Sequence, residues 1–300
     1  MSNGARNIAA SIRQKLKNRA AQDKRTFAEL LQYYAMERFL FRLTQSRHAE
    51  RFILKGALML RVWQAPEIRP TMDIDLLGNT SNDIGLICSQ ISDIVSFETN
   101  DGLIFDPDTI RGEAIKEDAD YEGVRVRFTG TLDGARVHMQ IDIGFGDVIH
   151  PDPVISELPT VLDGPAPKLS CYSRESVIAE KFEAMIKLGE LNSRMKDFYD
   201  IWLLSRQFDF ESTSLARAIQ LTLENRGTEI PEVITAFTEE FISNKQKQWQ
   251  AFCNRLKQDH IPTDFSEIVT SIKTFIKPLI LMPSTENTFP SHWSAPGPWS

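Results

Sequence analysis

The sequence lacks several features that would define its class at once. No stretch approaches the ~18 consecutive apolar residues of a membrane-spanning helix, and the N-terminus has no apolar run of the signal-peptide type. The three cysteines are far apart and odd in number: Cys88, Cys171 and Cys253. This spacing fits neither a disulfide framework nor a zinc site, and it favours a reduced, cytoplasmic protein with no membrane association.

The chain also lacks an excess of positive charge. Its 34 lysines and arginines stand against 41 aspartates and glutamates, which gives a net charge of −7 at pH 7. Such a protein is not a general polyanion binder, so any contact with RNA must use locally placed basic residues. With 300 residues, 42% of them hydrophobic, the chain can bury a sizeable core in one large domain or two modest ones.

The stretch that is most informative about chemistry runs from residue 51 to residue 78. A short apolar strand leads into Lys55-Gly56 and a short helical run, and after a polar loop a second strand carries Asp73 and Asp75. Side chains two positions apart in a strand point the same way. Paired carboxylates repel each other unless a cation lies between them, and such oxygen ligands suit Mg²⁺. The plainer alternative is that one Asp caps a turn and the other is a solvated edge residue.

A glycine at a strand-to-helix junction adds to this pattern. Gly56 precedes Asp73 by about 17 residues, and backbone N–H groups at such a junction can face a phosphate.

The clearest hairpin signal lies between residues 124 and 144. Two alternating strands flank Asp133-Gly134, a dipeptide that favours a tight turn. On the second strand, Asp142 shares a face with His138 and Gln140. Asp142 is the candidate for a third carboxylate if its strand lies beside that of Asp73 and Asp75. Otherwise it is a polar residue on the exposed face of a one-sided sheet.

Two helical segments carry further candidates. Ser173 begins a predicted helix in which Lys181 lies among apolar neighbours. Its ammonium group could reach a triphosphate, or it could be a surface lysine with a buried stem. Asp197 and Asp200 are three residues apart on one face of a further predicted helix. Asp197 could lie beside the site or pair with Lys181 or Arg194.

Together these motifs resemble the nucleotidyltransferase superfamily, and more closely its AbiEii/AbiGii toxin branch. The resemblance spans roughly residues 25 to 210 and implies an α/β (α+β) fold, a mixed β-sheet flanked by helices. It implies catalytic, metal-binding roles for Asp73, Asp75 and Asp142. It also implies nucleotide binding by Lys55, Gly56, Lys181 and Asp197. The matching segments are Leu54-Lys55-Gly56, residues 69–77, Glu180-Lys181 and residues 194–200.

The resemblance also implies an activity and partners. With Mg²⁺ as cofactor, a toxin of a type IV toxin–antitoxin system would transfer NMP from an NTP to RNA, at the 3′ end of a tRNA, or to a protein hydroxyl. A separately encoded antitoxin would be its partner. One departure is the sequence Gly56-Ala57-Leu58, because family members commonly carry Gly-Gly-Thr or Gly-Ser here. The hydroxyl that would help to seat a phosphate is missing.

Two other classes stay open at this point. The first is a catalytically weak or inactive interaction protein on the same scaffold, since a fold does not guarantee its chemistry. The second is a nucleotidyltransferase that modifies small molecules, as antibiotic-modifying enzymes do. An inactive interaction protein should not bind NTP in a metal-dependent way, whereas an enzyme should. A small-molecule nucleotidyltransferase differs from the toxin in the acceptor that it modifies.

The pattern of helices and breaks predicts the organisation of the chain. We expect an N-terminal helical segment at 1–45, a nucleotidyltransferase core at 46–168, a helical C-terminal subdomain at 169–282 and a flexible Pro/Ser-rich tail at 283–300. Residues 102–117 are expected to form two short strands, and the Pro-rich residues 150–168 a loop or domain boundary. The first helix is basic, which indicates a solvated face or an RNA- or partner-docking face.

Overall fold

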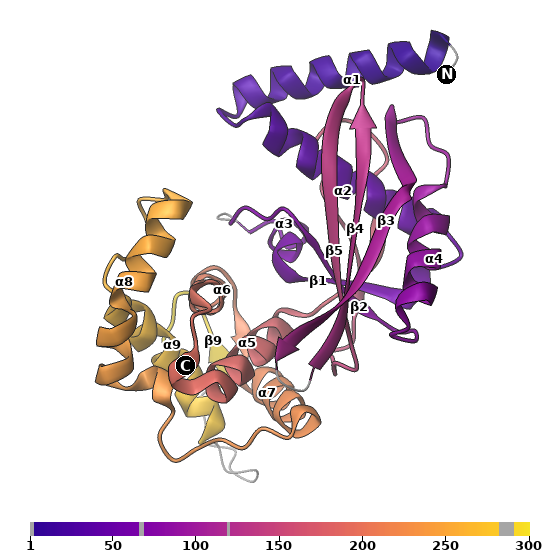
Figure 1. The fold of residues 1–300 in the computed structure, drawn as a ribbon. Coiled ribbons are helices and arrows are strands. Elements are labelled where there is room, and N and C mark those ends of the chain that lie inside the picture. Colours follow the sequence, from indigo (N-terminus) through magenta and orange to yellow (C-terminus); the bar gives the residue numbers. More distant parts are fainter. Residues whose placement is uncertain (1–2, 66–68, 119–120, 282–290) are drawn as a thin grey trace. The chain divides into compact units, whose positions relative to one another are not determined.

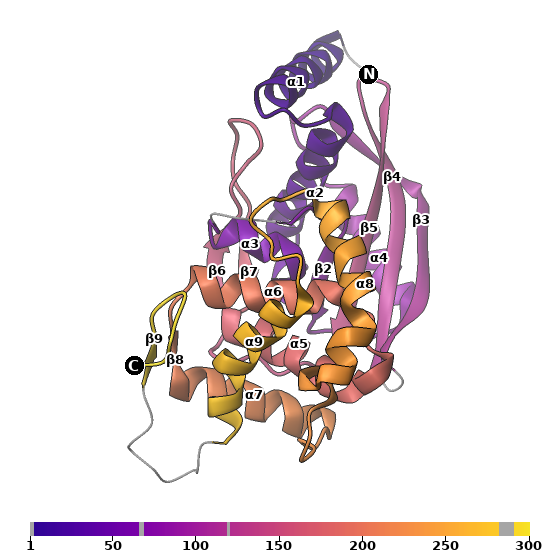
Figure 2. The same ribbon diagram turned by 90° about the vertical axis from the view of Figure 1, so that its left-hand side faces the viewer.

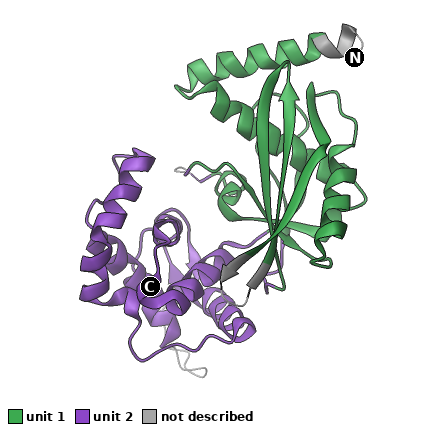
Figure 3. Cartoon of the chain, viewed as in Figure 1, with its two compact units in different colours: residues 1–64, 70–146, 154–171 green, residues 65–69, 147–153, 172–300 purple. Residues whose placement is uncertain are grey.

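The computed structural model describes residues 3–65, 69–118, 121–281 and 291–300. Contacts divide the chain into two compact units, which Figure 3 shows in two colours. Unit 1 comprises residues 1–64, 70–146 and 154–171, and unit 2 comprises residues 65–69, 147–153 and 172–300. The segment expected at 1–45 therefore belongs to the same unit as the sheet. In the described part of the chain, no helix has the length and apolarity needed to cross a bilayer.

Unit 1 is built on a seven-stranded mixed sheet, as the sequence predicts (Figure 1). Its strand order is β3-β4-β5-β2-β1-β7-β6. β2 pairs with β5, and β1 with β7, in parallel, whereas the other neighbours are antiparallel. The strands are β1 (Phe52–Lys55), β2 (Ile74–Gly78), β3 (Leu103–Asp118), β4 (Tyr121–Leu132), β5 (Ala135–Phe145), β6 (Val154–Glu157) and β7 (Lys168–Cys171).

The predicted hairpin is formed by β4 and β5. Asp133 and Gly134 have φ values of +45° and +77°, as a two-residue turn of the primed type requires. From this turn the register runs without a break from Leu132↔Ala135 to Val124↔Ile143. Every residue of β5 in this stretch therefore has a defined neighbour on β4.

Two expectations about strands in unit 1 were wrong. Residues 103–118 form one long strand rather than two short ones. Pro107 lies in the register shift between Asp106 and Arg111, where a residue without an N–H group does not break the pairing with β4. The Pro-rich segment 150–168 is not all loop, because it contains β6 at residues 154–157. β6 pairs with β7 alone, which is the edge position that flanking prolines permit.

One face of the sheet in unit 1 is covered by helices, as Figures 1 and 2 show. Phe39 of α2 packs against Phe128 of β4 with ring centroids 5.8 Å apart. A Cβ at Gly112 of β3 would meet Ile84 and Cys88 near the start of α4. The helices and 3-10 turns of this unit are α1 (Asn3–Gln22), α2 (Phe27–Gln45), η1 (Ala49–Arg51), η2 (Gly56–Leu58), α3 (Met59–Val62) and α4 (Ile84–Val95).

The other face of β3, β4 and β5 is polar, and we call it the polar face. On β4, Val124, Val126 and Phe128 are buried, whereas the alternate residues Arg125 and Arg127 are half-buried and exposed. This alternation of period two is that of a sheet with one face on the core. The polar face comprises Ile104, Asp106, Arg111, Glu113, Arg125, Arg127, Thr129, Thr131, Arg136, His138, Gln140 and Asp142, which the strand register places on one side.

Unit 2 is mainly helical. The side chain of Ser173 accepts a hydrogen bond from the N–H of Ser176, so the predicted start of α5 is confirmed. Residues 239–256 form one continuous helix. Its elements are α5 (Arg174–Leu188), η3 (Gly189–Leu191), α6 (Met195–Gln207), β8 (Phe210–Glu211), α7 (Ser212–Arg226), η4 (Thr235–Phe237), α8 (Glu239–Leu256), α9 (Phe265–Ile280) and β9 (His292–Trp293).

The C-terminal residues of unit 2 pack on its own helices. Within the tail expected at 283–300, residues 283–290 lie outside the described residues. Beyond them, Trp293 is only 3% exposed, and its ring lies 4.7 Å from that of Phe275 in α9. Its indole N–H donates to the carbonyl of Ser205 over 2.6 Å. The described end of the chain is thus anchored through a buried aromatic residue.

Candidate active site

Three carboxylates meet on the sheet of unit 1. One oxygen from each of Asp73, Asp75 and Asp142 can be chosen so that all lie within 4.8 Å of one another. Asp75 and Asp142 are direct partners across the parallel strands β2 and β5. The sequence predicted that Asp73 lies within the strand, but Asp73 is the residue immediately before β2. The spatial convergence that the sequence predicts is therefore present.

The burial of apolar residues explains why two of the carboxylates face the same way. Ile74 and Leu76 in β2, and Ile141 in β5, are fully buried on the helix-covered face. Because neighbouring residues of a strand point to opposite faces, this burial turns Asp75 and Asp142 away from that face.

The two strand carboxylates occupy the middle of a row of charged residues that crosses five strands. The register pairs Lys55 with Asp75, Asp75 with Asp142, Asp142 with Arg125, and Arg125 with Glu113. Residues that are paired across strands lie on one face. A cationic residue therefore flanks the acidic pair on each side, which reduces the cost of placing two carboxylates together.

Arg125 holds Asp142 with both arms of its guanidinium group. Its Nε and one terminal nitrogen donate to the two oxygens of Asp142 over 2.8 Å and 2.7 Å. This hydrogen bonding raises the pKa of Arg125 above its usual range. Since β5 lies between β4 and β2, Arg125 approaches Asp142 from the strand that is remote from Asp75. The arginine therefore orients the third carboxylate from outside the cluster.

The loop before β2 is fixed by α2. The hydroxyl of Thr71 donates to Asp73, and the N–H of Thr71 donates to the hydroxyl of Tyr33 over 3.1 Å. The buried amide of Gln32 donates to the carbonyls of Met72 (3.0 Å) and His138 (3.1 Å). One side chain of α2 thus ties the residue before Asp73 to β5, the strand that carries Asp142.

The glycine turn lies against the carboxylates. Gly56 has φ +74°, and a Cβ built on it would stand 1.9 Å from an oxygen of Asp75. Both the backbone conformation and the space therefore require glycine. The preceding Lys55 is buried, with 7% exposure. Gly56 begins a short 3-10 turn, η2, which is followed by α3 at residues 59–62, so the predicted short helical run is present.

The donor set fits a hard divalent cation. The three groups supply only oxygen atoms, Asp73 and Asp75 are half-buried, and carboxylates of this kind bind Mg²⁺ with part of its water shell retained. Paired acids without a cation repel each other. The geometry is therefore suited to a divalent metal that could be shared with a phosphate group.

The remaining predicted site residues lie in unit 2. Lys181 donates to Asp197 over 2.9 Å and approaches Asp200 to 2.8 Å. Arg69 binds both oxygens of Asp200, at 2.7 Å and 3.0 Å. Burial opposes these charges, but Asp197 and Asp200 hold the pKa of Lys181 above its usual range. Burial likewise opposes the charge of Asp200, but Arg69 and Lys181 keep its pKa well below the usual one. The structure thus pairs Asp197 with Lys181, one of the roles considered for Asp197, and the Lys181 side chain is only 15% exposed.

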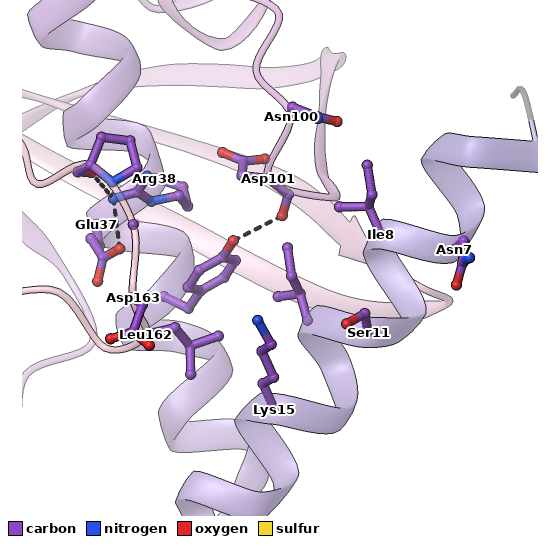
Figure 4. Close-up of a pocket in the computed structure, with 14 residues that line it drawn as sticks. Asn7, Ile8, Ser11, Lys15, Glu37, Arg38, Asn100, Asp101, Leu162 and Asp163 are labelled. Atoms are coloured by element: carbon purple, nitrogen blue, oxygen red, sulfur yellow. Dashed lines mark hydrogen bonds and ion pairs between the residues drawn. The ribbon is translucent and has the colours of Figure 1, made fainter.

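A separate pocket of about 480 Å³ lies beside α1 (Figure 4). Its buried charges are paired with each other: Arg38 with Glu37 at 2.7 Å, and Arg42 with Asp101 at 2.7 Å. Its lining includes none of the sequence-predicted site residues. The acidic cluster therefore stands as the candidate site.

Sequence reasoning did not identify Arg125, Thr71 or Gln32. A signal for Arg125 was available, because in a hairpin with a two-residue turn each step back along one strand matches a step along the other. Counting from Asp133-Gly134 in this way places Arg125 opposite Asp142, as the register shows. For Gln32 no local pattern exists, since its partners Met72 and His138 are remote in sequence. Thr71 lies two residues from Asp73, to which it donates, but its other partner, Tyr33, is remote.

Comparisons with known proteins give a consistent picture. A search among curated proteins gave no match. Two solved Helicobacter pylori structures are similar to this chain. One, provisionally described as a nucleotidyltransferase, has 13% identity and a TM-score of 0.47, and the match covers 84% of this chain and 97% of the other. The second is JHP933, with 12% identity, a TM-score of 0.45 and coverages of 80% and 90%.

A family model covers most of the chain. The model described as "Nucleotidyl transferase AbiEii toxin, Type IV TA system" matches residues 38–271. This range includes the acidic cluster, Gly56, Lys181 and Asp197. The chain therefore belongs to the AbiEii family of nucleotidyltransferase toxins of type IV toxin–antitoxin systems.

Proposed function

We propose that this nucleotidyltransferase transfers an NMP from an NTP to an RNA acceptor, the 3′ end of a tRNA, in a Mg²⁺-dependent reaction. The observation that carries the proposal is the convergence of Asp73, Asp75 and Asp142 to within 4.8 Å on one side of the sheet. The partners of the protein are the NTP and a separately encoded antitoxin, as membership of a type IV toxin–antitoxin family implies.

In the proposed reaction, the acceptor hydroxyl attacks the α-phosphorus of the NTP. A new phosphorus–oxygen bond forms, the bond between the α-phosphorus and the bridging oxygen breaks, and pyrophosphate leaves. Asp73 and Asp75 would hold a divalent metal, and Asp142 would share it and accept the proton of the acceptor hydroxyl. The chemistry that such a metal would supply is neutralisation of the negative charge on the reacting phosphate and its attacking and leaving oxygens.

The other residues position these groups. Arg125 fixes both oxygens of Asp142. Gly56 lets the backbone lie against Asp75, so that the turn can admit a triphosphate beside Lys55. Lys181 is proposed to bind the triphosphate as a point charge, with Asp197 holding its ammonium group in place.

A labelled-NTP assay tests the proposal. The purified protein is incubated with each of the four labelled NTPs, Mg²⁺ and either total tRNA or a protein extract. We expect label on tRNA from the wild-type protein and at least a ~100-fold lower rate from Asp73→Asn. Asp152→Asn, which removes an exposed loop carboxylate, serves as the charge-matched control and keeps the wild-type rate.

The other classes give different results in the same assay. Label on protein and not on tRNA would show that the acceptor is a protein hydroxyl and not the 3′ end of a tRNA. Label on neither, with Asp73→Asn as toxic to cells as the wild type, would identify an inert interaction protein. Label on an antibiotic or another small molecule would identify a small-molecule nucleotidyltransferase.

A further inference from the structure

A group of arginines shares the polar face with Asp142. Arg111 and Arg127 lie directly opposite each other on β3 and β4, Arg125 lies opposite Asp142, and Arg136 is six residues from Asp142 on β5. Arg111, Arg127 and Arg136 are exposed and Arg125 is half-buried. We call Arg111, Arg125, Arg127 and Arg136 the arginine track.

The stability of the sheet does not explain this arrangement. Like charges that face each other across two strands destabilise the pair, and Arg111 and Arg127 do so in a chain with a net charge of −7. Glu113 compensates in part through an ion pair with Arg127, but both side chains are about half exposed, at 53% and 50%. An exposed pair of this kind contributes only ~0–1 kcal/mol, so a phosphate can compete for Arg127.

The track is too long for a single nucleotide. Arg136 and Asp142 are six positions apart in β5, which corresponds to about 20 Å at the rise of an extended strand. At about 3.4 Å per nucleotide along a duplex, this length accompanies about six nucleotides. A polymer with regularly spaced negative charge fits the track better than a drug-sized molecule does.

The residue types indicate how such a polymer would be held. Among the polar-face residues of the paired segments 125–131 of β4 and 136–142 of β5, none is Phe, Tyr or Trp; they are Arg125, Arg127, Thr129, Thr131, Arg136, His138, Gln140 and Asp142. Surfaces that recognise single-stranded bases rely on stacking against aromatic rings. Arginines and threonines without such rings bind phosphates, which gives affinity without a strong base preference.

Positive charge continues beyond the hairpin. Arg13 of α1 donates to the carbonyl of Asp133 at the hairpin tip over 2.7 Å, and Figure 1 shows α1 at this end of β4 and β5. The helix contains five basic residues and no acidic one: Arg6, Arg13, Lys15, Lys17 and Arg19. It lies outside residues 38–271, the range that the family model matches. α1 therefore extends the basic surface with residues that the family model does not cover.

We propose that the arginine track, extended by α1, binds the phosphate backbone of the RNA acceptor and directs its 3′ end toward Asp142. This inference rests on the proposed function and adds the acceptor surface to it. The acidic chain binds RNA only along this local surface, chiefly through phosphates, so affinity depends strongly on salt and weakly on base sequence.

Binding is measured separately from catalysis. Fluorescence anisotropy follows fluorescein-labelled tRNA on Asp73→Asn protein, and on the same protein with Arg127→Gln and Arg136→Gln added. The matched control adds Arg47→Gln and Arg51→Gln instead, two exposed arginines of the same unit outside the track. Melting temperatures confirm that each variant is folded. Duplex DNA of equal length and a polyglutamate peptide are parallel probes.

We expect the track variant to bind tRNA about 10-fold more weakly at 100 mM salt. The slope of log binding constant against log salt concentration should become shallower by about 2. The control stays within about 2-fold, and tRNA binds more tightly than the DNA and the peptide. Equal losses in both variants, or a track that binds purified antitoxin instead of tRNA, would overturn the inference. Track-dependent tRNA binding without label transfer would leave the surface standing and remove the proposed reaction.

Discussion

At Gly56 a single missing Cβ makes room for the carboxylate of Asp75. The site needs the backbone of the η2 turn and the side chain of Asp75 in one small volume, and the space where a Cβ would lie is taken by Asp75. The conformation is also left-handed, with φ +74°. Steric and conformational requirements therefore coincide at the residue that the sequence pattern singles out.

Gly56→Ala should consequently damage both stability and metal binding. We expect a loss of about 2–4 kcal/mol in the free energy of unfolding and at least ~10-fold weaker Mg²⁺ binding, because Asp75 must move. Denaturant unfolding and titration calorimetry measure the two effects.

Gly134→Ala is the matched control. Gly134 has a similar φ of +77°, but nothing lies within 4 Å of an added Cβ. It should cost only the backbone term of about 1 kcal/mol and leave Mg²⁺ affinity unchanged. If both variants lost metal affinity equally, the steric argument for Gly56 would be wrong.

The Arg125–Asp142 contact leads to a second prediction. Arg125→Gln removes a positive charge that competes with a metal for Asp142, so Mg²⁺ should bind several-fold more tightly. The metal-free protein should lose about 1–3 kcal/mol, because the buried carboxylate loses its charged partner. The transfer rate should fall about 10-fold, because Asp142 is no longer oriented.

Arg125→Lys separates charge from geometry. A lysine keeps the charge but lacks the planar fork that binds both oxygens. We therefore expect nearly unchanged Mg²⁺ affinity together with a reduced transfer rate. Unchanged rates in both variants would show that Arg125 does not position Asp142.

At the scale of elements, local patterns predicted most helices and the hairpin, because capping residues and period-two alternation are local signals. Ser173 at the start of α5 and the Asp133-Gly134 turn are examples. Local signals failed where tertiary pairing decides: β3 continues through Pro107 because β4 holds it on both sides of the shift.

The candidate site shows the same division. Asp73 and Asp75 follow from a motif of three residues. The place of Asp142 depends on the parallel pairing of β2 with β5, between residues 67 positions apart, and no local rule fixes which strands become neighbours. Only the family resemblance pointed to it. The pairing of Lys181 with Asp197 was one of two roles considered, and the two-armed contact of Arg69 with Asp200 was not foreseen.

The contacts between α5 and α6 lead to a pH prediction. The depressed pKa of Asp200 contributes stability above the ordinary carboxyl pKa of about 3.9, and this contribution is lost as pH falls through the folded value. The raised pKa of Lys181 contributes stability below about 10.4 that persists until pH exceeds the folded value. Unfolding curves should therefore show acid loss below about pH 4 and no loss from Lys181 up to about pH 10.

Asp200→Asn tests this assignment. It should cost about 3–5 kcal/mol at neutral pH, since it breaks a buried ion-pair network by removing the carboxylate that binds Arg69 with two arms and that also pairs with Lys181. It should also reduce the loss of stability at acid pH. Asp93→Asn, at an exposed carboxylate whose pKa is lowered by His48 and Arg47, should change stability little. An acid slope that Asp200→Asn leaves unaltered would assign it to other carboxylates.

At the scale of the whole molecule, the predicted site residues belong to both compact units. The three carboxylates, Lys55 and Gly56 lie in unit 1, whereas Lys181 and Asp197 lie in unit 2. Binding of a ligand to either group would slow amide hydrogen exchange in that unit alone. Hydrogen exchange can therefore test the proposed role of each group in nucleotide binding.

Hydrogen exchange should resolve the contributions of the two units. Mg²⁺ alone should slow exchange only around β2, β5 and the Gly56 turn. Mg²⁺ with a non-hydrolysable NTP should also protect α5 and α6 if Lys181 binds the triphosphate as proposed. Lys181→Met should abolish the second effect and keep the first. Protection confined to unit 1 with nucleotide present would remove Lys181 and Asp197 from the nucleotide site.

The row of charges from Lys55 to Glu113 has a consequence for how the chain assembles. A shift of β5 by one position against β2 would turn Asp142 into the apolar interior and bring Ile141 or Ile143 to the surface. Mispaired sheets would thus carry a buried charge and fail to persist. The acidic residues of the candidate site thus also favour the native strand register during folding, so a sheet with shifted strands has little chance to accumulate.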